Sequence, residues 1–278
     1  MSLNSSTVIF MHGMKKICFT CSHRKTNMTN NKIKQIQSLE RGKYRREHSQ
    51  FFIEGKRLIE SALEFGAKIE NVYYTDSFKN ENPVLIQTIE QAGLSLEQIP
   101  AKQLEKISFT QSPAGIAAVC NFPPIGNPDV NQHKWLYLYQ VSDPGNMGTL
   151  FRSAAWFGFT HIALSPDCVD PFNPKVVRAG MGAHFGLSIH TDINLDIFSD
   201  SHTLVGADHR GDSLDDFTTP DRFILVLGSE VHGLSNDILR IIDQTISIGK
   251  TGFGESLNVG VAGAILMHKL SFINRILS

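Results

Sequence analysis

The chain has 278 residues, of which 41% are hydrophobic and 19% are charged, and a chain of this length can bury one large core or two smaller ones. The longest apolar stretch without a charge, residues 257–267, is shorter than the roughly 18 residues that a membrane-spanning helix needs, so a membrane protein is not expected. Four cysteines form no disulfide framework, which predicts a reducing compartment, the cytoplasm.

The net charge of −1 hides an asymmetry between the two parts of the chain. Residues 1–120 carry 16 Lys and Arg against 11 Asp and Glu, whereas residues 121–278 carry 10 against 16. A basic part can contact phosphates, and an acidic part binds polyanions poorly except at a local cationic site. The asymmetry therefore predicts different partners for the two parts, although solubility alone would also explain it.

The chain begins with a basic and polar segment, in which the first 39 residues include no acid. Residues 1–28 are predicted to be a flexible leader or an over-extended start, with natural initiation at Met28. A targeting presequence and residues added ahead of the natural start are the alternatives. Cys18, Cys21 and His23 supply half of a zinc site, but no second pair of ligands follows. No metal is therefore expected.

Residues 29–120 are predicted to form a small α/β unit, because short apolar runs alternate with amphipathic segments that end at glycine. The expected strands are 51–53, 69–75 and 115–119, and the expected helices are 57–65, 83–92 and 101–106. Cations are dense at the start of this unit and are predicted to contact phosphates. They are Arg41, Lys43, Arg45, Arg46 and Arg57. The segment 121–133 contains several prolines and is predicted to be a linker.

Residues 134–278 show short apolar strands that alternate with helices, which predicts a parallel sheet covered on both faces. The expected strands are 136–141, 161–165, 187–191, 203–207, 223–227 and 245–248. Helices are expected to begin after the cap residues Asn173 and Ser235, and the last helix is expected over 257–273. Asn173, Lys175 and Arg178 form a polar and basic cluster at a helix start, which is predicted to hold a phosphate.

Ligands bind beyond the carboxyl ends of the strands in open parallel sheets, so the loops that leave these strands are the candidate site. Three of them are rich in glycine: 143–148, 228–233 and 249–258. Glycine lets a backbone approach a ligand closely, although such turns also serve simply to reverse the chain. The fingerprints of dinucleotide-binding and phosphate-binding loops are missing from all three, which disfavours a dehydrogenase or a P-loop enzyme.

Three segments in these loops resemble the motifs of the SpoU/TrmH family of the SPOUT superfamily. They are Asn146 to Arg152, Leu227 to Leu234, and Ser256 to Val259, and the resemblance covers about residues 134–278. Members methylate ribose 2′-oxygens of RNA with S-adenosylmethionine. The resemblance implies a trefoil knot, an exception among protein folds, and a homodimer whose subunits both contribute to the catalytic site. The last helix is apolar enough for such an interface, but a core helix would look the same.

The amino-terminal unit also carries a resemblance. Residues 32–119, with Phe52 to Gly55 and Ser112 to Ile116, are similar to the family's RNA-binding domain, which has an α/β fold like that of ribosomal proteins. The resemblance therefore implies the following domain order. A leader of residues 1–28 is followed by an RNA-binding domain of residues 29–120, a linker of residues 121–133, and a methyltransferase domain of residues 134–278.

The resemblance also implies roles for single residues. Arg152 would lie at the 2′-hydroxyl and is proposed in the family to accept its proton. Because a guanidinium is always charged, orienting a phosphate by a bidentate contact is the preferred role. Asn146 and Asn258 are implied to fix the loops and to hold the reacting ribose. Ser256 is implied to hydrogen-bond Arg152 or the substrate, and Glu230 is implied to orient Arg152 or a backbone N–H. Those implied to hold the cofactor are Leu227, Gly228, Ile248, Leu257 and Ala207. Helix capping is the alternative for Glu230, and core packing for Ile248 and Leu257.

The sequence departs from the family pattern at a few positions. Gly249 and Lys250 stand where a proline and an apolar residue are usual, so the loop 249–254 is expected to be looser. Gly180 replaces a common serine. His184 and His232 lie near the motifs and are expected to be surface or capping residues rather than bases.

These observations predict an S-adenosylmethionine-dependent RNA 2′-O-methyltransferase that acts on ribosomal RNA, because a separate RNA-binding domain precedes the catalytic one. Transfer RNA is the alternative substrate. A catalytically silent RNA-binding or ribosome-assembly protein of the same fold is a second alternative, and a small-molecule enzyme on a doubly wound fold is a third.

Overall fold

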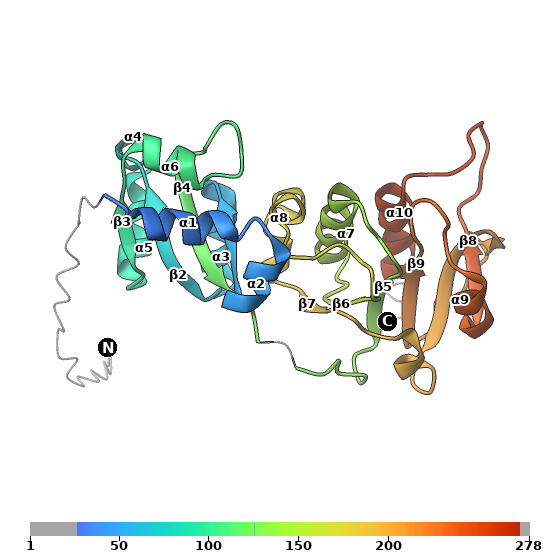
Figure 1. Cartoon of the computed structure of the whole chain (residues 1–278). Coiled ribbons are helices and arrows are strands. Elements are labelled where there is room, and N and C mark those ends of the chain that lie inside the picture. Colours follow the sequence, from blue (N-terminus) through green and yellow to red (C-terminus); the bar gives the residue numbers. More distant parts are fainter. Residues whose placement is uncertain (1–26, 125, 273–278) are drawn as a thin grey trace, which may run out of the picture.

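The computed structural model describes residues 27–124 and 126–272, which form two β-sheets with helices packed against them (Figure 1). Most of the predicted leader, with Cys18, Cys21 and His23, lies outside the described residues. Met28 is buried, and its backbone N–H donates to Gln103 Oε1 at 2.9 Å. In the described part of the chain, no helix is long and apolar enough to cross a membrane. The same residues contain no cluster of His, Cys, Asp and Glu suited to a metal ion.

The first sheet has the strand order β1-β4-β2-β3, with β2 and β3 parallel and the other pairs antiparallel. Its strands are β1 (Gln50–Glu54), β2 (Ile69–Tyr74), β3 (Leu96–Gln98) and β4 (Ile116–Asn121). Its helices are α1 (Asn30–Ser38), α2 (Gly42–His48), α3 (Lys56–Glu64), α4 (Asp76–Glu81), α5 (Pro83–Gln91) and α6 (Ala101–Ile107). Alternating side chains of β1 enter different cores, because successive strand residues point to opposite faces. Phe52 packs with α1 and α6, whereas Phe51 and Ile53 pack with α3 and α5.

All three strands and three helices that the sequence predicts in this part are confirmed, within a few residues at their ends. The sequence interpretation missed α1, α2, α4 and β3. Polar or charged residues dominate α1, and Ile33 and Ile36 are its buried residues. Its apolar signal is therefore too sparse to predict a helix, although Leu39 and the α6 side chains cover the same face.

The second sheet is fully parallel, with the order β10-β8-β9-β5-β6-β7. Its strands are β5 (Lys134–Leu138), β6 (His161–Leu164), β7 (Ser188–His190), β8 (Thr203–Ser213), β9 (Phe223–Leu227) and β10 (Gln244–Ser247). The helices that follow are α7 (Pro144–Trp156), α8 (Pro174–Gly180), η1 (Ala183–Phe185), η2 (Leu195–Phe198), α9 (Asn236–Ile241) and α10 (Val259–Phe272). One core lies under α7, α8 and α10, and the other lies under η2 and α9. The parallel sheet with both faces covered is confirmed, whereas the trefoil knot stays a prediction.

The predicted caps and strands of this second part are also confirmed. Asn173 accepts from the Lys175 N–H at 2.9 Å, and Ser235 accepts from the Ile238 N–H at 3.3 Å. Strand β8 is longer than expected because it pairs with β10 in two stretches. Gly206 is opposite Thr245, but the next partner of β10 is Asp212, so residues 207–211 bulge out between the two stretches.

The two sheets are joined by a contact between β1 and α8 (Figure 1). Phe172, just before α8, packs on Phe51 and Phe122, with ring centroids 4.9 and 4.5 Å apart. Beside it, the Arg45 guanidinium donates to Asp170 Oδ2 from Nε at 3.0 Å and from Nη2 at 2.6 Å. This ion pair connects α2 of the first part to the loop before α8 of the second.

Arg45 corrects the sequence interpretation, which assigned it to RNA. Its side chain is 2% exposed, and its Nη1 donates to the Leu39 and Glu40 carbonyls at 2.8 and 2.7 Å. Neighbouring cations on the same short helix, Lys43 and Arg46, are exposed. A helix turns about 100° per residue, so the same basic run supplies one inward and two outward cations.

His184 is buried as well, contrary to the expectation of a surface or capping residue. Its Nε2 lies 2.8 Å from the Pro171 carbonyl oxygen, and its Nδ1 has no hydrogen-bond partner among the described residues. The ring packs edge-on against Phe151, at 5.1 Å between centroids. Burial in this apolar surrounding lowers the pKa of His184 to about 4.

We expect this histidine to make the fold sensitive to acid. An unfolded histidine has a pKa of about 6.5, so protons bind the unfolded chain preferentially between pH 6.5 and 4. Stability is full above that window and falls as the pH drops through it, by up to about 1.4 kcal/mol per pH unit for one histidine. Urea unfolding at several pH values should show a shallower dependence in His184→Gln than in His232→Gln, whose histidine is exposed. Equal dependences in the two variants would contradict the assignment.

Candidate active site

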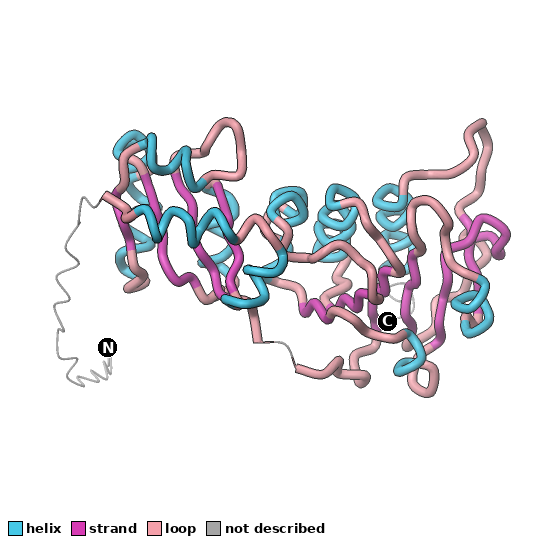
Figure 2. Tube along the Cα trace, in the orientation of Figure 1, coloured by secondary structure: helices cyan, strands magenta, loops and turns pink. Residues whose placement is uncertain are grey.

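The candidate site lies at the carboxyl ends of two neighbouring strands. Leu138 ends β5, Leu227 ends β9, and these two residues are paired in the parallel ladder. The loops that leave the two strands therefore start side by side at one edge of the sheet, where ligands bind in parallel α/β folds. A third loop, residues 249–258, joins β10 to α10 and extends away from the sheet (Figure 2).

A chain of hydrogen bonds joins the three loops. The Asn258 amide Nδ2 donates to Asn146 Oδ1 at 2.8 Å, and Asn146 Nδ2 donates to Glu230 Oε1 at 3.1 Å. Because a carboxylate only accepts, the Asn146 amide can satisfy both contacts in one orientation. The sequence interpretation placed these three residues in one site, and the structure brings them together.

Glu230 also fixes the loop after β5. Its carboxylate accepts from the Ser142 N–H at 3.4 Å and from the Asp143 N–H at 3.2 Å. The sequence left open whether Glu230 orients Arg152 or a backbone N–H, and the structure has the backbone contact. Asp143 in turn caps α7 by accepting from the Asn146 N–H at 2.8 Å. The sequence interpretation includes no role for the Ser142 or Asp143 side chain, although Asp before Pro is a recognisable helix start.

Asn258 has a second task at the start of α10. Its Oδ1 accepts from the Gly260 N–H at 2.9 Å and from the Val261 N–H at 3.3 Å. One amide therefore caps the helix with its oxygen and holds Asn146 with its nitrogen. This double use ties the entry of the last helix to the first turn of α7.

Arg152 and Ser256 do not belong to this hydrogen-bond chain. Both side chains are exposed, and neither forms a hydrogen bond with another described residue. Arg152 lies on α7, six residues after Asn146, which places its backbone about 9 Å further along the helix. Its guanidinium is therefore free to meet a group from outside the chain.

The glycine-rich turn after β9 is tightly closed. Ser229 and Gly233 exchange backbone hydrogen bonds of 3.1 and 3.0 Å, and Gly233 has a φ of +65°. A Cβ at Gly228 would lie 2.3 Å from the Gly233 carbonyl carbon, which no side chain can do without a backbone shift. The backbone at Gly228 is thus held in a place that only glycine permits.

The other candidate cofactor residues differ in burial. Leu227 is buried, and Ala207 and Ile248 are partly buried against the larger core of the second sheet. Leu257 is 52% exposed. In the loop before it, Lys250 Nζ donates to the Gly254 carbonyl at 2.6 Å, so this cation is held by its own loop.

The candidate RNA-binding residues, apart from Arg45, are accessible to different degrees. Those with exposed side chains are Arg41, Lys43, Arg46, Arg57 and Lys175. Arg178 is half-buried, and the side chain of Asn173 is used as the cap of α8.

The parallel sheet, with strand-end loops joined by two amides and a carboxylate, defines an α/β fold with one composite site. Residues 134–268 match the SpoU rRNA Methylase family, and residues 30–118 match the MRM3-like substrate binding domain. The chain belongs to the SpoU/TrmH methyltransferase family.

Individual relatives resemble the chain over nearly its whole length. The structure of a TrmH-family protein from Porphyromonas gingivalis is 30% identical, with a TM-score of 0.78 over 88% of this chain and 98% of that chain. An AdoMet-bound rRNA methyltransferase from Sinorhizobium meliloti is 26% identical, with a TM-score of 0.76 over 91% and 97%. The 23S rRNA (guanosine(2553)-2′-O)-methyltransferase RlmP of Bacillus subtilis is 29% identical over 87% of this chain and 96% of its own length.

Proposed function

We propose that this chain transfers a methyl group from S-adenosylmethionine to a ribose 2′-hydroxyl of ribosomal RNA. Membership of the SpoU/TrmH family and the rRNA 2′-O-methyltransferase among its relatives support this activity. The observation that carries it is the hydrogen-bond chain from Asn258 through Asn146 to Glu230. It assembles the three family motifs into one site.

The residues at this site fit the cofactor. Gly228 has no side chain, and the backbone of Gly233 packs where its Cβ would lie, so no side chain at this position covers the backbone groups that would hold the polar parts of the cofactor. Leu227 and Ile248 offer apolar surface, and the half-exposed Leu257 can cover a purine from the loop side. Ala207 completes this set. When bound, S-adenosylmethionine supplies an electrophilic methyl group on its sulfonium.

The chain's own residues position the ribose. A hydroxyl is a poor nucleophile, so its oxygen must be held in line with the methyl group. A guanidinium donates hydrogen bonds and accepts none, so we assign Arg152 to a phosphate beside the reacting ribose, in a bidentate contact. The amide chain of Asn146 and Asn258 fixes the loop on which the ribose rests, and the exposed Ser256 is available to the substrate.

Ribosomal RNA is the proposed substrate because residues 30–118 match a substrate-binding domain named for an rRNA-type relative. Incubating the protein with labelled S-adenosylmethionine and either unmodified ribosomal RNA or transfer RNA tests this choice. Label in ribosomal RNA supports it, and label in transfer RNA alone overturns it. We also propose that the chain acts in the cytoplasm, the reducing compartment that its four cysteines predict.

We further propose a homodimer whose interface is formed by α7 and α10. Trp156 on α7 is 84% exposed, and Val261 and Ile265 on α10 are 49% and 39% exposed. The two helices contact each other, so these apolar side chains lie on adjoining surfaces that a second copy would cover. The second subunit would then complete the catalytic site.

Ile265→Asp is expected to dissociate this dimer, because a carboxylate would be desolvated in the interface. Light scattering during size-exclusion chromatography should give the mass of one chain for this variant and of two chains for the wild type. Ile197→Asp is the control, since Ile197 is similarly exposed (46%) on η2. A wild-type protein with the mass of a single chain would refute the dimer.

A further inference from the structure

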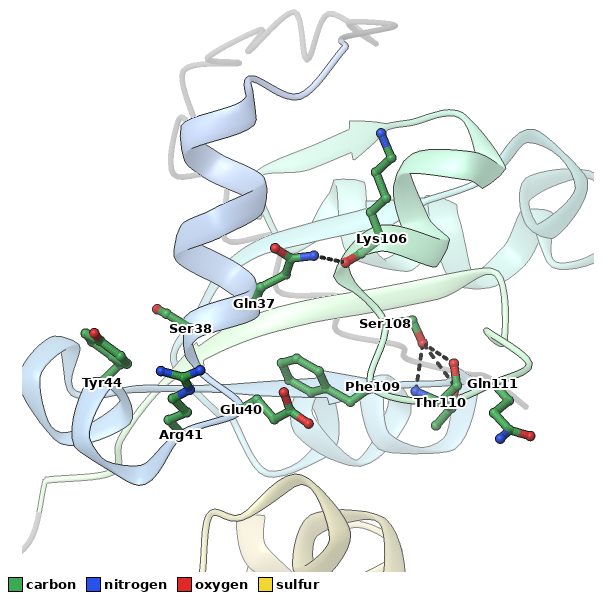
Figure 3. Close-up of a pocket in the computed structure, with 10 residues that line it drawn as sticks. All are labelled: Gln37, Ser38, Glu40, Arg41, Tyr44, Lys106, Ser108, Phe109, Thr110 and Gln111. Atoms are coloured by element: carbon green, nitrogen blue, oxygen red, sulfur yellow. Dashed lines mark hydrogen bonds between the residues drawn. The ribbon is translucent and has the colours of Figure 1, made fainter.

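The first part of the chain contains a pocket that none of the site residues described above accounts for. Its volume is about 660 Å³, within the range of small-molecule sites. It lies between the end of α1, the start of α2 and the segment after α6 (Figure 3). Its lining residues are Gln37, Ser38, Glu40, Arg41, Tyr44, Lys106, Ser108, Phe109, Thr110 and Gln111.

The wall after α6 is held in place by one carboxylate. Glu54, at the end of β1, accepts from the Ser108 hydroxyl, from the Thr110 hydroxyl at 2.8 Å and from the Phe109 N–H at 3.3 Å. These three bonds satisfy a half-buried charge and fix the segment that carries the Phe109 ring. The ring also packs edge-on against Phe52, with centroids 5.1 Å apart.

The opposite wall is held by two other contacts. Gln37 Nε2 donates to the Lys106 carbonyl at 2.7 Å and ties α1 to α6. The buried Arg45 holds the Leu39 and Glu40 carbonyls, which fixes the turn that carries Arg41. The pocket is therefore formed by segments that are positioned before any ligand arrives.

The groups that remain available in the pocket suit a nucleotide. The rings of Phe109 and Tyr44 are half-exposed, and Figure 3 shows Arg41 on the side of the pocket toward which the Phe109 ring points. The exposed Arg41 side chain forms no hydrogen bond or ion pair with another described residue. Aromatic rings and guanidinium planes stack on unpaired bases, and guanidinium also pairs with phosphate. Glu40 can accept from base N–H groups.

We propose that this pocket binds one unstacked nucleotide of a single-stranded stretch of the RNA substrate, with its base on Phe109 and its phosphate on Arg41. The proposal rests on the proposed function, because it takes the substrate to be RNA. A double helix does not fit this role, since its bases are stacked on each other and their planes are not accessible.

The position of the pocket favours RNA over a protein partner. Exposed cations continue from Arg41 along α2 through Lys43 and Arg46, which suits a phosphate backbone. The same wall meets the loop before α8 in the second part of the chain, because a Cβ at Gly42 would lie 3.2 Å from Asp170 Oδ2. RNA held in the pocket would thus lie next to the catalytic part of the chain, in which Lys175 is an exposed cation at the start of α8.

The test measures the affinity of the full chain for a short unstructured RNA that contains 2-aminopurine, whose fluorescence reports stacking. Phe109→Leu keeps the apolar contact with Phe52 and removes the aromatic plane, and we expect about tenfold weaker binding with loss of the fluorescence change. Arg41→Gln should lower the slope of log affinity against log salt by about 0.7, the contribution of one phosphate on a single strand. Lys34→Gln is the control, because this cation is exposed on α1 outside the pocket.

Wild-type affinity in Phe109→Leu would overturn the proposal, and so would an equal loss in Lys34→Gln and Arg41→Gln. Equal competition by a duplex of the same length would also overturn it. The pocket and the proposed activity fail in different ways. If no RNA is methylated but Phe109→Leu binds the oligonucleotide tenfold more weakly, the pocket stands and the activity does not. If the wild type and Phe109→Leu methylate ribosomal RNA with the same kcat/KM, the proposed activity stands and the proposed role of the pocket does not.

Discussion

Arg152→Ala is expected to lower methyl transfer by roughly a hundredfold or more, because misplacing a reacting group by about 1 Å already costs that much. The variant should keep the stability of the wild type to within about 0.5 kcal/mol, as surface substitutions generally do. Arg152 is exposed and has no hydrogen bond to another described residue, so its loss breaks nothing within the chain. Initial rates with ribosomal RNA and urea unfolding measure the two effects.

Two companion variants sharpen this result. Arg152→Lys keeps the charge without the bidentate geometry, so we expect a rate between those of the wild type and the alanine variant. Arg240→Ala removes another exposed arginine, on α9, which is 77% exposed and paired to Asp237. It should leave the rate unchanged. Transfer at the wild-type rate by Arg152→Ala would remove this residue from the mechanism.

Asp170→Ala is expected to cost about 3 kcal/mol or more in unfolding free energy, because it leaves a buried guanidinium without its counter-ion. Arg45 is 2% exposed and Asp170 is 21% exposed, and the pair joins the two parts of the chain. The substitution also removes a hydrogen bond that holds the loop before α8, since Asp170 Oδ1 accepts from the Phe172 N–H at 2.8 Å. Urea unfolding of the single variants and of Arg45→Met with Asp170→Ala gives the coupling between the two side chains.

An exposed ion pair provides the matched control. Lys269 and Asp215 are 3.3 Å apart, and their side chains are 37% and 85% exposed. Asp215→Ala should therefore cost less than about 1 kcal/mol. If Asp170→Ala were as harmless as Asp215→Ala, the pair would not hold the two parts of the chain together.

The strands of the second sheet could be predicted because each contains a short apolar run whose signal is local. All six strands of the second sheet appear where those runs lie. Helix α1 could not be predicted, because it has few apolar residues. They form part of a core only through contact with α6, which is distant in the sequence. For the same reason the sequence assigned Arg45 to RNA, because its partner Asp170 is 125 residues away.

The candidate site was predicted in part. The motifs that contain Asn146, Glu230 and Asn258 are visible in the sequence, and the structure brings these three side chains together. Their mutual bonds depend on the register that pairs Leu138 with Leu227, which no local pattern contains. The role of Glu230 as an acceptor for backbone N–H groups follows from that same register. The assignments of Arg152 and Ser256 stay predictions, because neither exposed side chain forms a hydrogen bond with another described residue.

If the three joined loops present a methyl group to a sugar oxygen, the transferred label must lie on a ribose of the RNA. Ribosomal RNA labelled by the wild-type protein is digested to nucleosides, which are separated and identified by mass. We expect label in a single 2′-O-methylated nucleoside, and no label with Asn146→Ala, which breaks the bonds to Glu230 and Asn258. Label on a base, or full labelling by Asn146→Ala, would contradict it.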